Sequence, residues 1–225
     1  MTKLLLQSLG AFLVGAVALG LFIFLPAGTL NYWQAWVFIV VFGLSANFTG
    51  IWLSLKDPAL LERRKKFGPA QESSPAQKII MLLVLLSAAA LLIVSALDHR
   101  FGWSHVPAII ALLGDALVVI GLGLDLLVLR ENSYSGSTVE VREGQTLIST
   151  GPYAQVRHPM YTGALIMCIG VPLALGSWWG LVALAVTMPV LAWRILDEEQ
   201  LLRRDLPGYA EYAQRVHYRL VPYVW

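Results

Sequence analysis

Long apolar runs separated by short polar segments dominate the hydrophobicity pattern of this chain. The first four runs are nearly free of charge and cover residues 4–25, 32–55, 79–97 and 106–129. Each is close to the roughly 20 residues that cross the hydrocarbon core of a bilayer as a helix. The pattern therefore predicts four plain membrane-spanning helices in the first part of the chain.

Two shorter apolar runs follow at residues 160–175 and 178–193, and only Gly176 and Ser177 separate them. Runs of this length are at the low end for spanning a bilayer. We predict a tight hairpin of two helices that are thin or partly inserted. The predicted fold class is an all-α integral membrane protein with about six transmembrane helices, including this C-terminal helical hairpin.

Composition agrees with a membrane protein and excludes an ordinary soluble domain. The 225 residues are 57% hydrophobic and only 13% charged, and the mean hydropathy is +0.68. The net charge of +2 does not argue for nucleic acid, because the basic residues follow the topology. Cys168 is the single cysteine and lies in an apolar run, which excludes disulfides and thiolate metal sites. We expect the lipid bilayer as a partner, with no nucleic acid and no metal.

Basic residues fall almost entirely on one side of the predicted spans. They include Lys3, Lys56, Arg63, Arg64, Lys65, Lys66, Lys78, Arg130, Arg142, Arg157 and Arg194, whereas Arg100 falls on the other side. By the positive-inside rule, both termini and the region between Arg130 and Arg157 are expected in the cytosol. Lys3 precedes an apolar run longer than the roughly 7 to 15 residues of a signal-peptide core, so we expect a retained span.

The chain divides into two regions of one membrane domain. Residues 1–129 form a four-span membrane region without a chemical motif, and residues 130–225 carry the candidate chemistry. Prolines in residues 57–77 predict a loop, with a short amphipathic segment at residues 60–66. Residues 131–156 lack a long helical pattern but contain apolar side chains that can pack. We expect turns and short extended pieces there, folded over the cytosolic face.

Two acids lie inside the fourth span, where an acid at the bilayer centre costs roughly 2.5 to 3.5 kcal/mol on insertion scales. Asp125 is close to the cytosolic end and can reach water there. Asp115 is deeper, and either pairs with another helix or faces a polar cavity. Their roles stay open at the level of sequence.

The polar segment before the hairpin offers groups that can hold an anion. Because His158 precedes Pro159, we expect His158 at the N-cap and Pro159 at the first position of a helix. The unpaired amides of its first turn favour an anionic group, and Arg157 can add charge-assisted hydrogen bonds. The same residues also fit a plain helix start with Arg157 on a lipid phosphate.

Arg194 and Glu198 lie four residues apart, on one face of the second hairpin helix. A surface ion pair would explain them. If the hairpin helices pack antiparallel, however, they also come close to His158, which predicts a pocket at the membrane surface. The amphipathic segment at residues 199–206 is expected to lie against this pocket and close it.

Residues 130–225 resemble the isoprenylcysteine carboxyl methyltransferase family, membrane enzymes that use S-adenosylmethionine. The resemblance rests on spaced elements in the family's order, at residues 145–148, 151–153, 157–163, 194 with 198, and 201–212. It implies a cytosolic cofactor pocket formed by the loop before the hairpin and the C-terminal helices. With Arg157 from the helix start, the expected S-adenosylmethionine site comprises Gln145, Thr146, Leu147, Ile148, Tyr153, Arg157, His158, Pro159, Met160, Tyr161 and Glu198.

The resemblance also implies that Arg194 binds and orients the carboxylate of the acceptor. Gln145 is a departure, since family members that act on prenylated proteins tend to have His there. Methyl transfer from a sulfonium needs alignment of donor and acceptor, and a carboxylate needs no general base. We therefore expect methyl-ester formation on an apolar small-molecule or lipid-modified acceptor.

Three alternatives remain open. A phospholipid N-methyltransferase would need Glu198 or His158 to deprotonate an amine. An NADPH-dependent sterol-reductase-like enzyme fits a similar Arg-His-Pro-x-Tyr motif and a similar ending at residues 218–223. Those enzymes typically have Asn and Asp where this chain has Met160 and Ala164. A non-enzymatic transporter or structural subunit would instead use the acids of the fourth span.

Overall fold

The computed structural model describes residues 2–225, with side chains described at residue 7 and from residue 9 onward. Lys3, which contributed to the predicted orientation, lies outside the described side chains. The helices are α1 (Thr2–Ala27), α2 (Trp33–Lys56), α3 (Pro58–Lys65), η1 (Pro69–Gln71), α4 (Pro75–Phe101), α5 (Ala108–Glu131), η2 (Gly151–Ala154), α6 (Pro159–Ala174), α7 (Trp179–Asp205) and α8 (Tyr209–Arg215). No strand occurs within residues 2–225.

Five helices are long and apolar enough to cross a membrane: α1 from Leu9 onward, α2, α4, α5 and α7. The predicted all-α, multi-pass integral membrane fold is therefore confirmed, with five candidate spans in the described chain where about six were expected. Helix α6 has 16 residues and is about 24 Å long at 1.5 Å per residue. It is short, as predicted.

Helix α7 is longer than predicted. It has 27 residues and runs without a break from its apolar half through Arg194 to Asp205. The segment at residues 199–206, expected to close the pocket, continues this helix as far as Asp205 because no Gly or Pro occurs between Trp193 and Pro207. The last turns of α7 therefore project beyond its apolar part and carry polar side chains into the site.

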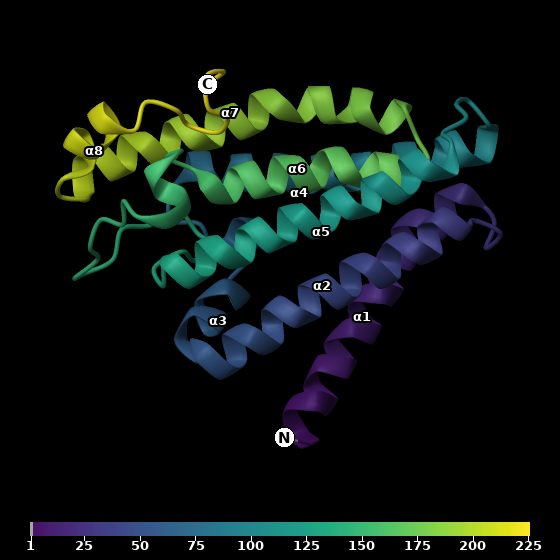
Figure 1. The fold of residues 1–225 in the computed structure, drawn as a ribbon, viewed down its shortest axis with the longest axis horizontal. Coiled ribbons are helices and arrows are strands. Elements are labelled where there is room, and N and C mark those ends of the chain that lie inside the picture. The colour runs from purple at the N-terminus through teal and green to yellow at the C-terminus, as the bar shows by residue number, and fades with distance from the viewer. Residues whose placement is uncertain (1) are drawn as a thin grey trace.

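The helices form a bundle with two distinct ends (Figure 1). Helix α6 lies along α5, α7 lies along α4, and α2 contacts both α1 and α5. Helices α3 and α8 and the loop before α6 gather at one end, which we call the site end. The turns that join α1 to α2, α4 to α5 and α6 to α7 lie at the opposite, far end.

Glycines bring α5 and α6 into close backbone contact. Gly114 and Gly121 of α5 face Gly170 and Gly163 of α6. A Cβ atom at Gly121 would lie 2.6 Å from the carbonyl oxygen of Gly163, closer than such atoms approach. Small residues allow this spacing between membrane helices. The contact fixes the start of α6 against the end of α5.

Asp98 braces the far end of the bundle. It is fully buried at the end of α4 and accepts hydrogen bonds from the Ser104 backbone N–H at 2.8 Å and from the hydroxyl of Ser177 at 2.6 Å. Ser177 lies in the turn between α6 and α7, and its hydroxyl also accepts the N–H of Gly180 at 3.0 Å. A buried carboxylate is tolerated when hydrogen bonds satisfy it, and here these bonds tie three helix ends together.

At the site end, α3 is the short amphipathic segment that the sequence predicts. Asp57 caps it by accepting the N–H of Leu60 at 2.9 Å, and Leu60 packs against Leu53 of α2 and Leu129 of α5. This packing also fixes the position of Arg64, which lies in the last turn of α3. The acids of α5 lie in different places: Asp125 lines a cavity at the site end, and Asp115 is buried closer to the far end. The Oδ1 atom of each has no hydrogen-bond partner in the described chain.

Candidate functional site

A cavity of about 480 Å³ opens at the site end, between α4, α5, α6, α7, α8 and the loop before α6. Pockets of roughly 300 to 1,000 Å³ are typical of small-molecule sites. The cavity has a polar part under the loop and α8, and an apolar part that runs between α6 and α7 past Cys168, Leu184 and Met188. Polar chemistry at the membrane surface is thus joined to an apolar channel at membrane depth.

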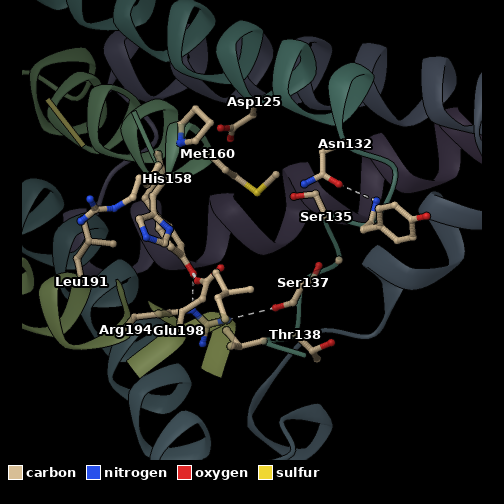
Figure 2. Close-up of a pocket in the computed structure, with 18 of the residues that line it drawn as sticks. Asp125, Asn132, Ser135, Ser137, Thr138, His158, Met160, Leu191, Arg194 and Glu198 are labelled. Atoms are coloured by element: carbon tan, nitrogen blue, oxygen red, sulfur yellow. Dashed lines mark hydrogen bonds between the residues drawn. The ribbon is translucent and has the colours of Figure 1, made fainter. Parts of the chain in front are cut away.

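Every residue predicted for the cofactor and acceptor sites lines this one cavity. They are Gln145, Thr146, Leu147, Ile148, Tyr153, Arg157, His158, Pro159, Met160, Tyr161, Arg194 and Glu198. Figure 2 shows His158 and Met160 from the start of α6 facing the same space as Arg194 and Glu198 of α7. The hairpin brings the two sets together, as its predicted antiparallel packing requires.

The start of α6 has the predicted local structure. His158 is the N-cap and Pro159 is the first helical residue. The N–H of Arg157 donates to the carbonyl of Tyr218 and that of His158 to the carbonyl of Arg219, both at 2.9 Å. The C-terminal tail therefore holds the helix start, whose first-turn amides lack intrahelical partners and are suited to an anionic group.

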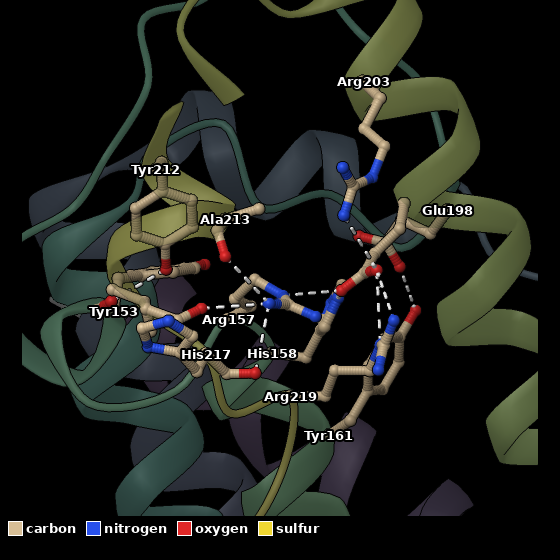
Figure 3. A network of polar contacts seen from close by, with 12 residues as sticks. Tyr153, Arg157, His158, Tyr161, Glu198, Arg203, Tyr212, Ala213, His217 and Arg219 are labelled. Atoms are coloured by element: carbon tan, nitrogen blue, oxygen red, sulfur yellow. Dashed lines mark hydrogen bonds and ion pairs between the residues drawn. The ribbon is translucent and has the colours of Figure 1, made fainter. Parts of the chain in front are cut away.

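The guanidinium of Arg157 contacts several protein groups. Its guanidinium is buried and donates to Glu199 Oε1 at 2.7 Å. It also donates to the carbonyls of Ala213, Val216 and His217 at the end of α8 (Figure 3). These bonds occupy the group, so the expectation that Arg157 grips the cofactor or a lipid phosphate is not supported by its contacts. It joins α7 and α8 to the start of α6.

Glu199 is the acid at the centre of this network. Besides Arg157, it faces His158 Nε2 at 3.3 Å and accepts from Arg219 Nε at 3.2 Å, with Arg203 at 3.9 Å on its outer side. The Glu199 side chain is 4% exposed. A carboxylate so deeply buried is stable because several cationic donors compensate it.

Arg194 and Glu198 do not form the surface ion pair that their spacing allows. Glu198 Oε2 accepts the hydroxyl of Tyr161 at 2.6 Å, and this hydroxyl in turn accepts Arg194 Nε at 3.1 Å. The guanidinium of Arg194 also donates to Glu72 at 3.0 Å and to Gln77 at 2.8 Å. Tyr161 thus links the two charged groups, and Arg194 already has a carboxylate partner.

The loop over the cavity is held by its own polar and apolar contacts. Gln145 Oε1 accepts the N–H of Arg142 at 3.1 Å, a local turn contact made by the glutamine side chain. Leu147 packs against Tyr209 and Tyr212 of α8, and the Tyr212 hydroxyl donates to the carbonyl of Tyr153 at 2.7 Å. These contacts form a lid over the polar part of the cavity, built from the turns that were expected for residues 131–156.

Tyr153 stands at the edge of this lid. Its hydroxyl accepts a hydrogen bond from Asn132 at 2.9 Å. Burial raises the pKa of Tyr153 above its ordinary value, and the negative charge of Glu198 acts in the same direction. Tyr153 therefore stays protonated, and it lines the cavity as a neutral side chain.

Several polar atoms of the cavity lining are left for a ligand, among them Asp125 Oδ1, which is buried without a hydrogen-bond partner in the described chain. The hydroxyl of Tyr209 lines the cavity, is buried and has no hydrogen-bond partner within the described residues. Glu198 uses Oε2 for Tyr161, and its other oxygen makes no hydrogen bond to the described chain. A carboxylate oxygen suits ammonium or ribose hydroxyl donors, and an unpaired hydroxyl suits an acceptor on a nucleoside. Aromatic and leucine side chains supply an apolar wall, so the residues fit S-adenosylmethionine.

Sequence reasoning missed several residues of the site: Glu72, Gln77, Glu199, Tyr209 and the cavity-facing role of Arg64. Glu72 and Gln77 flank the start of α4, more than a hundred residues from Arg194. No periodicity links such distant positions. Glu199 had a local signal, because it lies four residues before Arg203 on a helix. Its burial, however, could not be seen without the packed tail.

Comparison with known proteins identifies two similarities. Residues 109–206 match the family model described as phospholipid methyltransferase. The chain is also 34% identical over 91 residues to a Δ14-sterol reductase, TM7SF2, of Mus musculus, which covers 39% of this chain and 22% of the reductase. The chain thus spans about a fifth of the length of this curated relative. Residues 109–206, which contribute most of the cavity lining, are therefore similar to phospholipid methyltransferases.

Proposed function

We propose that this protein is an integral membrane methyltransferase that transfers a methyl group from S-adenosylmethionine to an apolar or lipid-linked acceptor. The observation that carries the proposal is the convergence on one cavity of side chains from four separate segments of the sequence. The family match over residues 109–206 supports the same reaction class. When bound, S-adenosylmethionine would supply an electrophilic methyl group on a sulfonium.

The residues of the site have distinct tasks in this proposal. Glu198 holds the cofactor through its free carboxylate oxygen, and Tyr161 orients Glu198 through the bond of 2.6 Å. Arg194 fixes Tyr161 at 3.1 Å, while the lid excludes water from the polar part. These tasks align donor and acceptor, which is the main requirement of an in-line displacement.

The acceptor group in this proposal is a carboxylate, which yields a methyl ester. A carboxylate is already ionised at neutral pH, so no general base is needed. His158 Nε2 faces Glu199, and Glu198 accepts the hydroxyl of Tyr161, so in this proposal both side chains position groups and neither serves as a base. In this proposal the site faces the cytosol, which the basic residues at the site end support through the positive-inside rule.

Cofactor binding tests the proposal directly. Calorimetry of the detergent-solubilised protein should show binding of S-adenosylmethionine, and Glu198→Gln should weaken it about tenfold, because a hydrogen bond to a charged group is lost. Glu211→Gln on the exposed face of α8 is the matched control and should bind as the wild type does.

The similarity to the sterol reductase supports a second candidate function, that of an NADPH-dependent reductase. Titration with NADPH in the same calorimeter separates the two. A wild-type protein that binds NADPH and not S-adenosylmethionine would refute the methyltransferase. Labelled products that survive mild base would indicate N-methylation, as in a phospholipid methyltransferase, in place of an ester.

A further inference from the structure

The cavity wall carries three arginines, Arg64, Arg157 and Arg194, and their charges are not equally compensated. Arg157 pairs with Glu199 at 2.7 Å and Arg194 with Glu72 at 3.0 Å. Both pairs are buried, where separating a cation from its partner is costly. Neither arginine is therefore free to take an anionic group from a substrate.

Arg64 has weaker partners. Its Nη1 donates to the carbonyl of Ser135 at 3.4 Å and to the thioether of Met160 at 3.5 Å. Both distances are long, and a thioether is a poor acceptor. No Asp or Glu of the described chain lies within 4.0 Å of this guanidinium, the distance that defines the ion pairs of this structure. Most of its donors are therefore available.

The surroundings of Arg64 make an unpaired charge costly. Burial lowers the pKa of the guanidinium from its ordinary value, and the charge of Asp125 across the cavity opposes this shift. Arginine nevertheless stays protonated in proteins. A half-buried guanidinium that faces a cavity, without a carboxylate in contact, is a site that an anion would complete.

The position of Arg64 matches the place where the head of an apolar acceptor would lie. Helix α3 begins at Pro58, two residues after the candidate span α2 ends at Lys56, so Arg64 lies close to the membrane boundary. The apolar part of the cavity leads from there past Cys168 and Met188 to membrane depth. In Figure 2, Met160, which Arg64 contacts, lies across the cavity from Glu198.

We propose that Arg64 binds the oxyanion of the acceptor, a carboxylate or a lipid phosphate, while the apolar tail occupies the channel between α6 and α7. The inference rests on the proposed methyltransferase function. The anion would replace Ser135 and Met160 as the partner of Arg64, with two parallel hydrogen bonds of the kind guanidinium makes. It assigns acceptor binding to α3, outside the region of resemblance.

The inference is tested by measuring the binding of two probes that carry an oxyanion, and of one uncharged control, to the cofactor-loaded protein in detergent. Oleate supplies a carboxylate and dioleoyl phosphatidylethanolamine supplies a phosphate, whereas oleyl alcohol has the tail without the charge. Arg64→Gln should weaken binding of at least one anionic probe about tenfold, with oleyl alcohol unchanged. Arg64→Lys should restore part of the loss, and the probe that loses affinity identifies the oxyanion.

Arg63→Gln is the matched control. Arg63 is the neighbouring residue, but it donates to Ser133 at 2.5 Å and lies 3.9 Å from Asp57. The Arg63→Gln variant is expected to bind both probes as the wild type does. Equal losses in the two variants, unchanged probe binding in Arg64→Gln, or a wild type that binds S-adenosylmethionine but neither anionic probe would overturn the inference. A wild type that fails to bind S-adenosylmethionine would instead refute the proposed function.

Discussion

Glu199 shows how much of the site depends on a single buried side chain. It compensates Arg157 and Arg219 and faces the ring of His158. Through Arg157 it also holds the carbonyls that end α8. One carboxylate thus positions the N-cap of α6 and the C-terminal tail together.

We expect Glu199→Gln to destabilise the protein by about 3 to 5 kcal/mol, because it leaves buried cations without a counter-charge. Thermal unfolding in detergent measures the effect, and protease cleavage after α8 should become faster. Arg203→Gln removes only the half-exposed partner at 3.9 Å and should change stability by less than about 1 kcal/mol. Equal stability of the two variants would contradict this role for Glu199.

Arg194 and Arg64 together change the picture of acceptor recognition. The motif resemblance points to Arg194 as the carboxylate ligand, but Glu72 already occupies its guanidinium. The structure supports a positioning role for Arg194, through Tyr161 and Glu198. The cation with free donors comes from α3, which the motif does not include.

At the scale of elements, the contact between α5 and α6 sets the geometry of the site. Glycines allow the two backbones to touch, and this contact places His158, at the start of α6, in the cavity wall. By contrast, α7 packs on α4, and the apolar channel separates it from α6. The two hairpin helices, α6 and α7, therefore line opposite sides of the channel.

Gly121→Ala should destabilise the helix pair, because the added methyl would meet the carbonyl oxygen of Gly163 at 2.6 Å and Met167 Cβ at 2.8 Å. Overpacking of this kind costs roughly 1 to 3 kcal/mol. Gly123→Ala is the control on the same helix, since its Cβ would meet nothing within 4 Å. It should be neutral or stabilise by up to about 1 kcal/mol. Unfolding in detergent compares the variants, and a tolerant Gly121 would show that the helices can separate without cost.

At the scale of the whole molecule, the two ends of the bundle differ in charge. The basic residues of α3, of the end of α5 and of the end of α7 lie at the site end, whereas Arg100 lies at the far end. By the positive-inside rule we propose that the site faces the cytosol. Substrate would then reach the channel from the membrane and the cofactor from the cytosol.

Cysteine labelling tests this orientation. In a Cys168→Ser background, Glu143→Cys places a thiol on the exposed loop at the site end, and His105→Cys places one at the exposed far end. A membrane-impermeant maleimide should label position 143 only in inside-out vesicles and position 105 only in right-side-out vesicles. The reverse pattern would place the site outside the cytosol.

Local patterns in the sequence were sufficient for the elements. Apolar run length predicted the spans, because a bilayer fixes the length of a helix that crosses it. His158 and Pro159 predicted the start of α6, because a proline restricts the backbone of the residue before it and suits the first helical position. The motif resemblance identified residues that prove to share one cavity.

The partners of the charged side chains were decided only by the tertiary structure. Arg194 pairs with Glu72 across 122 positions of the chain, and Arg157 pairs with Glu199 across 42. Such pairs depend on which helix ends meet in space, and neither spacing nor hydropathy records that. The sequence by itself thus determined the helices and the residue types of the site. Packing decided which charges are compensated and left Arg64 with its donors free.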